Sequence, residues 1–291
     1  MPEGLVIRAL SGFYDVVDGD GTRRCRARGV FRKRGITVLV GDRVLYDPVG
    51  LTEGVVHSVL DRRTELVRPP VANVDQALLV FSLHSPEFHP SLLDRALVAT
   101  DSAGINPIIV ITKCDLGTSD EVDTAATSYR QAGYTVLPVS SVQNDGLHLL
   151  HDLVRGQITV FIGPSGVGKS TLGNALSPEL GLRMGAVSEK IQQGRHTTRH
   201  VELYQLDPET YVVDAPGFSQ LEITLASTDL RLYFPEFRTP MEACMYRGCL
   251  HVEETDCGVK AAVDAGTVAA ARYKSYRQLY LELRHKELTR F

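Results

Sequence analysis

The feature that most constrains this chain is the order of three nucleotide-binding motifs. Residues 163–170 read Gly-Pro-Ser-Gly-Val-Gly-Lys-Ser, which is the pattern of a phosphate-binding loop (P-loop), and they follow an apolar run. Residues 214–217 read Asp-Ala-Pro-Gly, a magnesium and switch motif, and residues 112–115 read Thr-Lys-Cys-Asp, a base-reading motif. In an ordinary GTPase the base-reading motif follows the other two, whereas here it precedes both. The order predicts a parallel sheet connected in circularly permuted order, which is tolerated where natural termini lie close together at the surface.

The P-loop carries the strongest signal. Its glycines allow backbone N–H groups to surround phosphates, Lys169 reaches the terminal phosphates, and the Ser170 hydroxyl can ligate magnesium. The residues expected to bind phosphate are Gly163, Pro164, Ser165, Gly166, Val167, Gly168, Lys169, Ser170 and Thr171. A glycine-rich turn without function is the alternative. An apolar strand before the loop and a helix after it favour the functional interpretation.

Asp214 lies at the end of an apolar run, where a carboxylate can hold magnesium through water. The Gly217 N–H is then expected to meet the terminal phosphate. A simple turn built on Pro216 and Gly217 is the alternative, because these residue types favour turns by themselves.

The base-reading motif predicts GTP rather than ATP. Asp115 is placed to accept two hydrogen bonds from guanine, while the Lys113 stem can cover the ring. Adenine lacks those donors and would leave the carboxylate unpaired. Thr112 stands where asparagine is usual, so one supporting hydrogen bond is expected to be lost or altered. Ser140 is expected to offer a backbone contact to the guanine oxygen, and a plain surface loop is the alternative.

A switch loop is expected at residues 194–199. There Thr198 would close on magnesium when the terminal phosphate is present. Phe218 occupies the position where many GTPases keep a water-orienting glutamine, and an apolar side chain cannot perform that role. His196 is therefore the candidate to orient or deprotonate water. A surface histidine that contacts a partner is the alternative.

Four clustered side chains predict a structural zinc site: Cys244, Cys249, His251 and Cys257. Three thiolates and one imidazole form a tetrahedral donor set that leaves no open position for chemistry. Buried free cysteines are the alternative. The remaining two of the 5 cysteines, Cys25 and Cys114, are expected to be ordinary thiols.

The 291 residues suit two or three domains. Short alternating runs up to about residue 66, including 25–31 and 38–40, predict a small barrel such as an OB-fold. The paired prolines in residues 67–73 predict a linker. Strand and helix patterns then alternate, which predicts a parallel sheet covered by helices, and one long helix is expected at residues 262–288. The expected domains are residues 1–68, 69–222 and 223–291.

Charge and hydropathy restrict the partners. The net charge of −4 gives no global sign of nucleic-acid binding. Basic runs at residues 23–28 and 32–34 could follow a phosphate backbone on an OB-fold, although a solvated charged face is the commoner cause of such runs. Apolar runs are far shorter than the roughly 18 residues of a membrane span, and no signal segment is visible, so a cytoplasmic protein without a membrane partner is expected.

The permuted order, residues 194–198 and the cysteine–histidine spacing together resemble the RsgA family of the YjeQ and YloQ type, over essentially the whole chain. These bacterial circularly permuted GTPases act in maturation of the small ribosomal subunit. The resemblance implies an OB-fold, a permuted GTPase domain and a zinc domain. It also implies magnesium with GTP or GDP, hydrolysis stimulated by the small subunit, and the subunit and its rRNA as partners of a monomer. A P-loop ATPase, and an RNA-binding module with nucleotide as a static ligand, are the competing readings.

Overall fold

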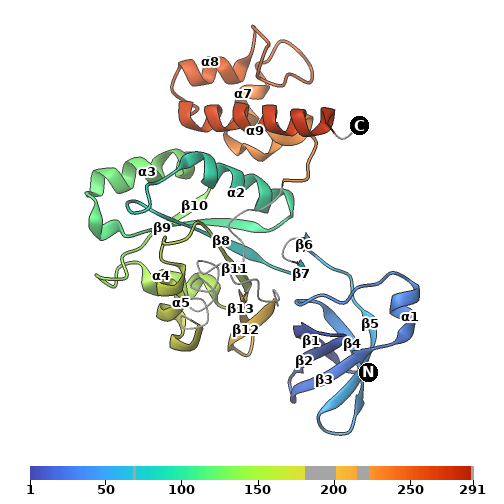
Figure 1. Ribbon diagram of the computed structural model, residues 1–291. Coiled ribbons are helices and arrows are strands. Elements are labelled where there is room, and N and C mark those ends of the chain that lie inside the picture. Colours follow the sequence, from blue (N-terminus) through green and yellow to red (C-terminus); the bar gives the residue numbers. More distant parts are fainter. Residues whose placement is uncertain (68–69, 181–200, 215–222, 290–291) are drawn as a thin grey trace.

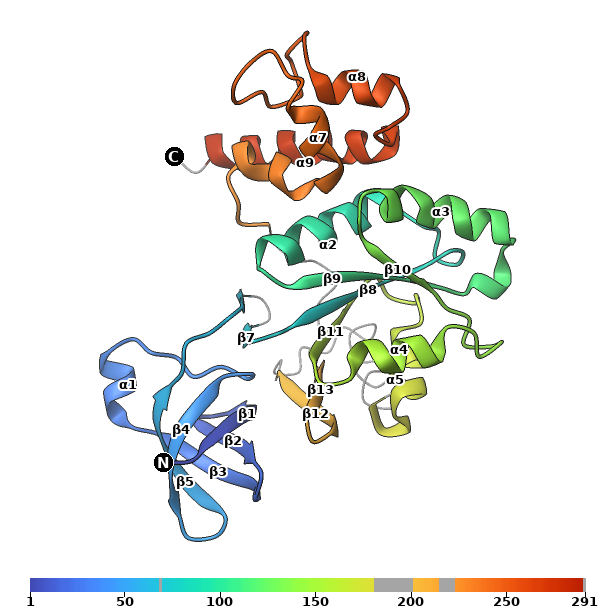
Figure 2. The same ribbon diagram turned by 180° about the vertical axis from the view of Figure 1, so that it is seen from behind.

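The computed structural model describes residues 1–67, 70–180, 201–214 and 223–289. The chain forms an N-terminal barrel, a central sheet covered by helices and a helical C-terminal region (Figure 1). Viewed from behind, the barrel and the helical region lie at opposite ends of the molecule, with the central sheet between them (Figure 2). None of the described helices combines the length and the apolar character that a membrane crossing requires.

The barrel closes through five strands. They are β1 (Glu3–Leu10), β2 (Phe13–Asp18), β3 (Gly21–Ala27), β4 (Arg43–Val49) and β5 (Glu53–Val59). The spatial order is β1-β2-β3-β5-β4, and β4 pairs back with β1. Every second side chain points inward, so that Val6, Val16, Val44 and Val56 are fully buried. The predicted barrel is therefore present.

Two predicted strands of the barrel differ from the structure, one of them only beyond Ala27. The pattern of residues 25–31 continues past Ala27, but the neighbouring β2 begins at Phe13, which pairs with Arg26. The last pair of β3 is Ala27 with Val56 of β5, and the chain then turns into the short helix α1 (Gly29–Lys33), with Phe31 buried in the barrel core. Residues 38–40 form only an isolated bridge, between Val40 and Val71.

The predicted linker at residues 67–73 is a hairpin instead. Strand β6 (Glu65–Val67) pairs with β7 (Pro70–Ala72), and Pro70 is tolerated because it is the first residue of its strand. The Asn73 amide donates to the Gly41 carbonyl at 2.9 Å, and Gly41 lies so close to Ala72 that an added Cβ would meet the Ala72 oxygen at 1.9 Å. Pro70 therefore belongs to a paired strand, and the residues that follow it are anchored to the barrel.

The central sheet shows the permutation directly. Its strands are β8 (Gln76–Ser82), β9 (Asn106–Thr112), β10 (Thr135–Pro138), β11 (Ile158–Ile162), β12 (Glu202–Asp207) and β13 (Thr210–Asp214). The spatial order is β10-β9-β8-β11-β13-β12, parallel except for β12. Three strands that precede β11 in the chain lie on one side of it, and two later strands lie on the other. The carboxyl ends of β9 and β11 consequently open at the same edge, where open α/β sheets bind ligands.

Helices cover both faces of this sheet. They are α2 (Pro90–Ser102), α3 (Ser119–Gln131), α4 (Leu147–Val154) and α5 (Lys169–Leu176). Helices α2 and α3 lie on one face, and α4 and α5 on the other (Figure 1). A capping box formed by Thr118 and Glu121 starts α3, and proline at the first turn starts α2.

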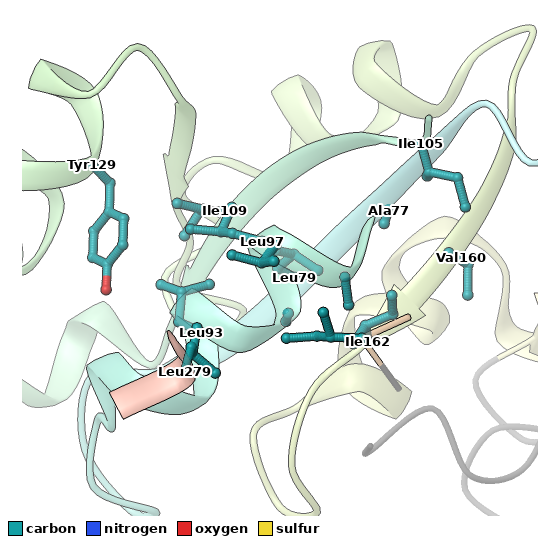
Figure 3. Close-up of a cluster of buried hydrophobic side chains, with 14 of the residues drawn as sticks. Ala77, Leu79, Leu93, Leu97, Ile105, Ile109, Tyr129, Val160, Ile162 and Leu279 are labelled. Carbon is teal, nitrogen blue, oxygen red and sulfur yellow. The ribbon is translucent and has the colours of Figure 1, made fainter. Parts of the chain in front are cut away.

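The largest buried cluster joins the sheet to the C-terminal region (Figure 3). Leu79 and Ile109 come from the sheet, Leu93 and Leu97 from α2, and Leu279 from the final helix. All five side chains are at most 3% exposed, and burial of each such side chain contributes about 1.5–3 kcal/mol. The final helix is therefore part of the same core as the central sheet.

The C-terminal region contains η2 (Ser227–Tyr233), η3 (Pro235–Phe237), α7 (Arg238–Met241), α8 (Gly258–Asp264) and α9 (Ala270–Leu288). The expected single helix over residues 262–288 is wrong. Gly266 has φ +74°, and the Gly266 and Thr267 N–H groups turn back onto carbonyls of α8, so this helix ends and α9 starts anew. Tyr276, Tyr280 and Leu283 fall at helical spacing on α9 and are all buried.

A buried ion cluster fastens α9 to α2. Arg272 is 2% exposed, and its guanidinium donates to Asp94 at 2.5 Å and to Glu236 at 2.7 Å. The same group lies 4.6 Å from the centroid of the Phe234 ring. Loss of the cation would leave two carboxylates in an apolar setting.

We therefore expect Arg272→Ala to destabilise the C-terminal region by about 3–5 kcal/mol, because it leaves the buried carboxylates of Asp94 and Glu236 without their cation. Denaturant unfolding followed by circular dichroism measures the change. Arg95→Ala is the matched control, since Arg95 pairs with Glu282 on the same two helices with side chains 28% and 33% exposed. The free energy of unfolding of the control should fall by no more than about 1 kcal/mol. Equal losses in the two variants would contradict the stabilising role assigned to the buried Arg272 cluster.

Candidate functional site

The P-loop connects β11 to α5 at the edge of the sheet. Gly163 passes so close to β8 that a Cβ would meet the Val80 carbonyl oxygen at 2.0 Å, and Gly168 has φ +98° immediately before α5. Only glycine fits these two positions without strain. The loop thus directs the N-terminal N–H groups of α5 at the position where anions bind.

Lys169 lies across the mouth of this loop. Its ammonium group donates to the Gly163 carbonyl at 2.7 Å and to the Pro164 carbonyl at 2.6 Å. Burial lowers the pKa of Lys169. Ser170 and Thr171 occupy the first turn of α5 behind it. The predicted phosphate ligands are therefore contiguous at one helix N-terminus.

The base-reading motif is tied directly to the P-loop. Thr112, the last residue of β9, is 4% exposed, and its hydroxyl donates to the Val167 carbonyl at 2.6 Å. Lys113 has φ +58°, and its ammonium group donates to the Gly166 carbonyl at 2.9 Å. Thr112, at the position where asparagine is usual, thus keeps a hydrogen bond, and the acceptor is the backbone of the P-loop.

Asp115 lies in the short helix η1 (Cys114–Leu116), directly after β9. The buried Ser140 hydroxyl donates to the Asp115 carboxylate at 2.7 Å, and the Ser140 N–H donates to the Asp145 carbonyl at 3.1 Å. Ser140 therefore orients the carboxylate through its side chain. The sequence pattern did not predict this contact, which depends on β10 ending beside β9.

The switch residues are only partly within the described chain. Asp214 is the last residue of β13, beside β11, with Val213 opposite Val160. The Asp214 side chain, and the whole of His196, Thr198, Gly217 and Phe218, lie outside the described residues. Their predicted roles in magnesium binding and catalysis stay predictions.

The predicted zinc ligands converge in the C-terminal region. The ligand atoms of Cys244, Cys249, His251 and Cys257 all lie within 4.8 Å of one another. The His251 Nδ1 atom is 3.3 Å from the Cys257 sulfur and 3.6 Å from the Cys244 sulfur. Burial lowers the pKa of His251 to about 4, so at neutral pH the imidazole is uncharged and offers a lone pair. The cluster fits a metal ion, because three sulfur atoms and one imidazole nitrogen converge there. Burial raises the pKa of the Cys249 thiol, and a bound cation would offset this by stabilising the thiolate.

The segment that carries two of these ligands is held by residues the sequence did not single out. The Glu254 carboxylate accepts from the Leu250 N–H at 2.8 Å and from the Val252 N–H at 3.0 Å. The Tyr273 hydroxyl donates to the His251 carbonyl at 2.8 Å. The sequence feature that could have indicated this support is the presence of acidic residues, Glu254 among them, between His251 and Cys257.

Comparison with known proteins identifies the family. The RsgA GTPase family matches residues 59–224, and the RsgA N-terminal domain matches residues 3–56. The chain belongs to the RsgA GTPase family. Two RsgA relatives, from Geobacillus kaustophilus and Bacillus anthracis, are each described as a small ribosomal subunit biogenesis GTPase. They are 47% and 46% identical over 291 residues, with 99% of both chains covered in each case.

Two solved RsgA-type structures share the fold. YloQ, described as a circularly permuted GTPase, is 42% identical with a TM-score of 0.83, over 98% of this chain and 96% of its own. YjeQ from Thermotoga maritima is 35% identical with a TM-score of 0.85, over 99% of both chains. The predicted family, the permuted GTPase fold and the N-terminal barrel are thereby confirmed, and the chain is a GTPase.

The first test of the nucleotide site concerns Asp115. We expect Asp115→Asn to shift the base preference from guanine toward xanthine, because the amide presents a donor where guanine also presents donors. Competition binding with GTP and XTP measures the preference. An unchanged preference for GTP would show that Asp115 does not read the base. Ser141→Ala, at the neighbour of Ser140, is the control and should leave the preference as it is.

Proposed function

We propose that this GTPase binds the small ribosomal subunit and couples GTP hydrolysis to a late step of its maturation. The observation that carries the nucleotide part is the direct hydrogen bond from Thr112 to the P-loop carbonyl of Val167. It holds the base-reading motif and the phosphate loop as one unit. The proposed role on the small ribosomal subunit is supported by relatives that match 99% of this chain and are named for that role.

Each predicted nucleotide contact has a proposed role. Thr112, Lys113, Asp115 and Ser140 form the guanine side, and residues 163–171 with Asp214 and Gly217 form the phosphate side. Ser170, Thr198 and Asp214 would hold magnesium, which neutralises charge on the phosphates when it is bound with GTP. Lys169, at the loop mouth, would act on the terminal phosphate. Pairing of β13 with β11 supports the shared site, since it brings Asp214 to the edge where the P-loop begins.

The barrel is proposed to contact rRNA. The guanidinium groups of Arg24 and Arg26 lie 4.8 and 4.7 Å from the centroid of the Phe13 ring. Cations stacked on an aromatic ring of a barrel offer both phosphate attraction and a stacking surface. We assign residues 1–68 to this part, 69–222 to the GTPase part and 223–291 to the zinc part. The protein would act in the cytoplasm as a monomer.

His196 is the proposed water-orienting group, since Phe218 cannot fill that role. The isolated protein is expected to hydrolyse GTP slowly, and docking on the small subunit to order residues 194–199 around the water. His196→Ala should then remove most of the subunit-stimulated turnover while GTP affinity and the basal rate stay almost unchanged. The measurement is multiple-turnover phosphate release, with and without small subunits.

The outcomes separate the roles of His196. Equal stimulation of variant and parent would remove His196 from the mechanism, and loss of subunit binding with a nonhydrolysable GTP analogue would make it a docking residue. His200→Ala, just outside the proposed switch loop, is the matched control and should keep the stimulation. A parent protein that small subunits do not stimulate would contradict the proposed function itself.

Zinc is the proposed occupant of the Cys244, Cys249, His251 and Cys257 cluster, because soft thiolates with one imidazole select it. We expect about one tightly held zinc per chain. Elemental analysis after metal-replete expression measures it, and its absence would contradict the assignment. Cys249→Ser should lower the stability of the C-terminal region and leave nucleotide affinity nearly intact. Cys25→Ser, in the barrel, is the control and should retain the metal.

A further inference from the structure

A groove lies between α3 and the first turn of α9, and none of the described residues that line it belongs to the P-loop. Its volume is about 500 Å³. The walls are mostly apolar and come from Leu83, Phe88, Pro90, Ala125 and Tyr129. A concave apolar site of this size, with a few polar groups, is the usual form of a ligand pocket.

The walls of this α3–α9 groove are fixed before any ligand binds. The Phe88 ring packs edge-to-face on Tyr129, with centroids 6.4 Å apart, and edge-to-face on Phe81 at 6.3 Å. Arg272 contributes to the lining, but Asp94 and Glu236 already neutralise its guanidinium. The groove therefore offers an apolar surface without an unpaired cation from Arg272.

The rim of the groove is acidic. Asp120 and Glu121, both exposed, lie in the first turn of α3. Hydrogen bonds from the Thr118 N–H and hydroxyl lower the pKa of Glu121, which keeps that carboxylate ionised at neutral pH. His84 lies 3.9 Å from the Glu121 carboxylate. Apart from Arg272, no lysine or arginine is among the described lining residues.

We propose that the α3–α9 groove binds a basic peptide segment of a partner protein. One apolar side chain of that segment fills the space beside Phe88 and Tyr129, and a flanking lysine or arginine pairs with Asp120 and Glu121. Charge complementarity favours this occupant, since the carboxylates at the rim would repel the phosphates of RNA. An apolar anchor flanked by charge is a common form of peptide recognition.

The test uses the full chain and a labelled lysine-rich peptide with one central phenylalanine. A second peptide has serine in place of that phenylalanine, and fluorescence anisotropy reports binding of each. The phenylalanine peptide should bind the parent roughly tenfold or more tightly than the serine peptide, because only the former fills the apolar space. Equal affinities, or no binding of either peptide, would overturn the proposal.

Matched variants localise the binding. Thr124→Trp fills the groove and should weaken the phenylalanine peptide roughly tenfold, whereas Thr127→Trp, on α3 but outside the groove, should not. Asp120→Lys should weaken binding more than Asp123→Lys, the same charge change outside the groove. GTP affinity controls for folding of each variant. Equal peptide affinities within either pair of variants would overturn the proposal. A parent protein that is a dimer and that Thr124→Trp dissociates would also overturn it, because the occupant of the groove would then be a second copy of this chain.

Discussion

The hydrogen bond from Thr112 to Val167 is the contact on which the proposed nucleotide site depends. It joins the end of β9 to the P-loop across the intervening strand β8, and Lys113 adds a second bond to the same loop. The residues proposed to bind guanine and those proposed to bind phosphate lie on different strand ends, so contacts of this kind must fix their relative position. Permutation leaves this arrangement intact, because it changes only the order in which the chain visits the strands.

The same strands carry the domains that flank the site. Strand β12 pairs with β13 and also, through Glu202 opposite Arg8, with β1 of the barrel. On the other side, α9 shares a core with α2 and is fastened by Arg272. The barrel and the helical region are therefore each in contact with the GTPase sheet through ordinary backbone pairing or buried packing. Such contacts are a physical route by which a partner on either side could affect the nucleotide site.

The sequence was informative where one residue type has one physical use. Glycines at positions 163 and 168 and the four metal-type donors predicted local geometry correctly, since few other structures need those residues in that spacing. The sequence was misleading where pairing with a distant strand decides the local structure. Residues 25–31 alternate like a strand, but strand pairing ends at Ala27, and Pro70 fits the start of a paired strand as well as a linker. The break of the last helix was foreseeable from Gly266, whereas the Ser140 contact to Asp115 depends on neighbouring strand ends.

The most direct test of the central contact is the GDP affinity of Thr112→Val beside that of Thr112→Ser. Valine keeps the shape of threonine but cannot donate to the Val167 carbonyl, which would stay buried without this partner. A lost bond of this kind costs about 1–3 kcal/mol, and nucleotide binding must then supply the free energy that holds the two segments together. We therefore expect roughly fivefold or greater weakening with valine and near-parental affinity with serine. Parental affinity in the valine variant, or equal weakening in both, would contradict the role assigned to this hydrogen bond.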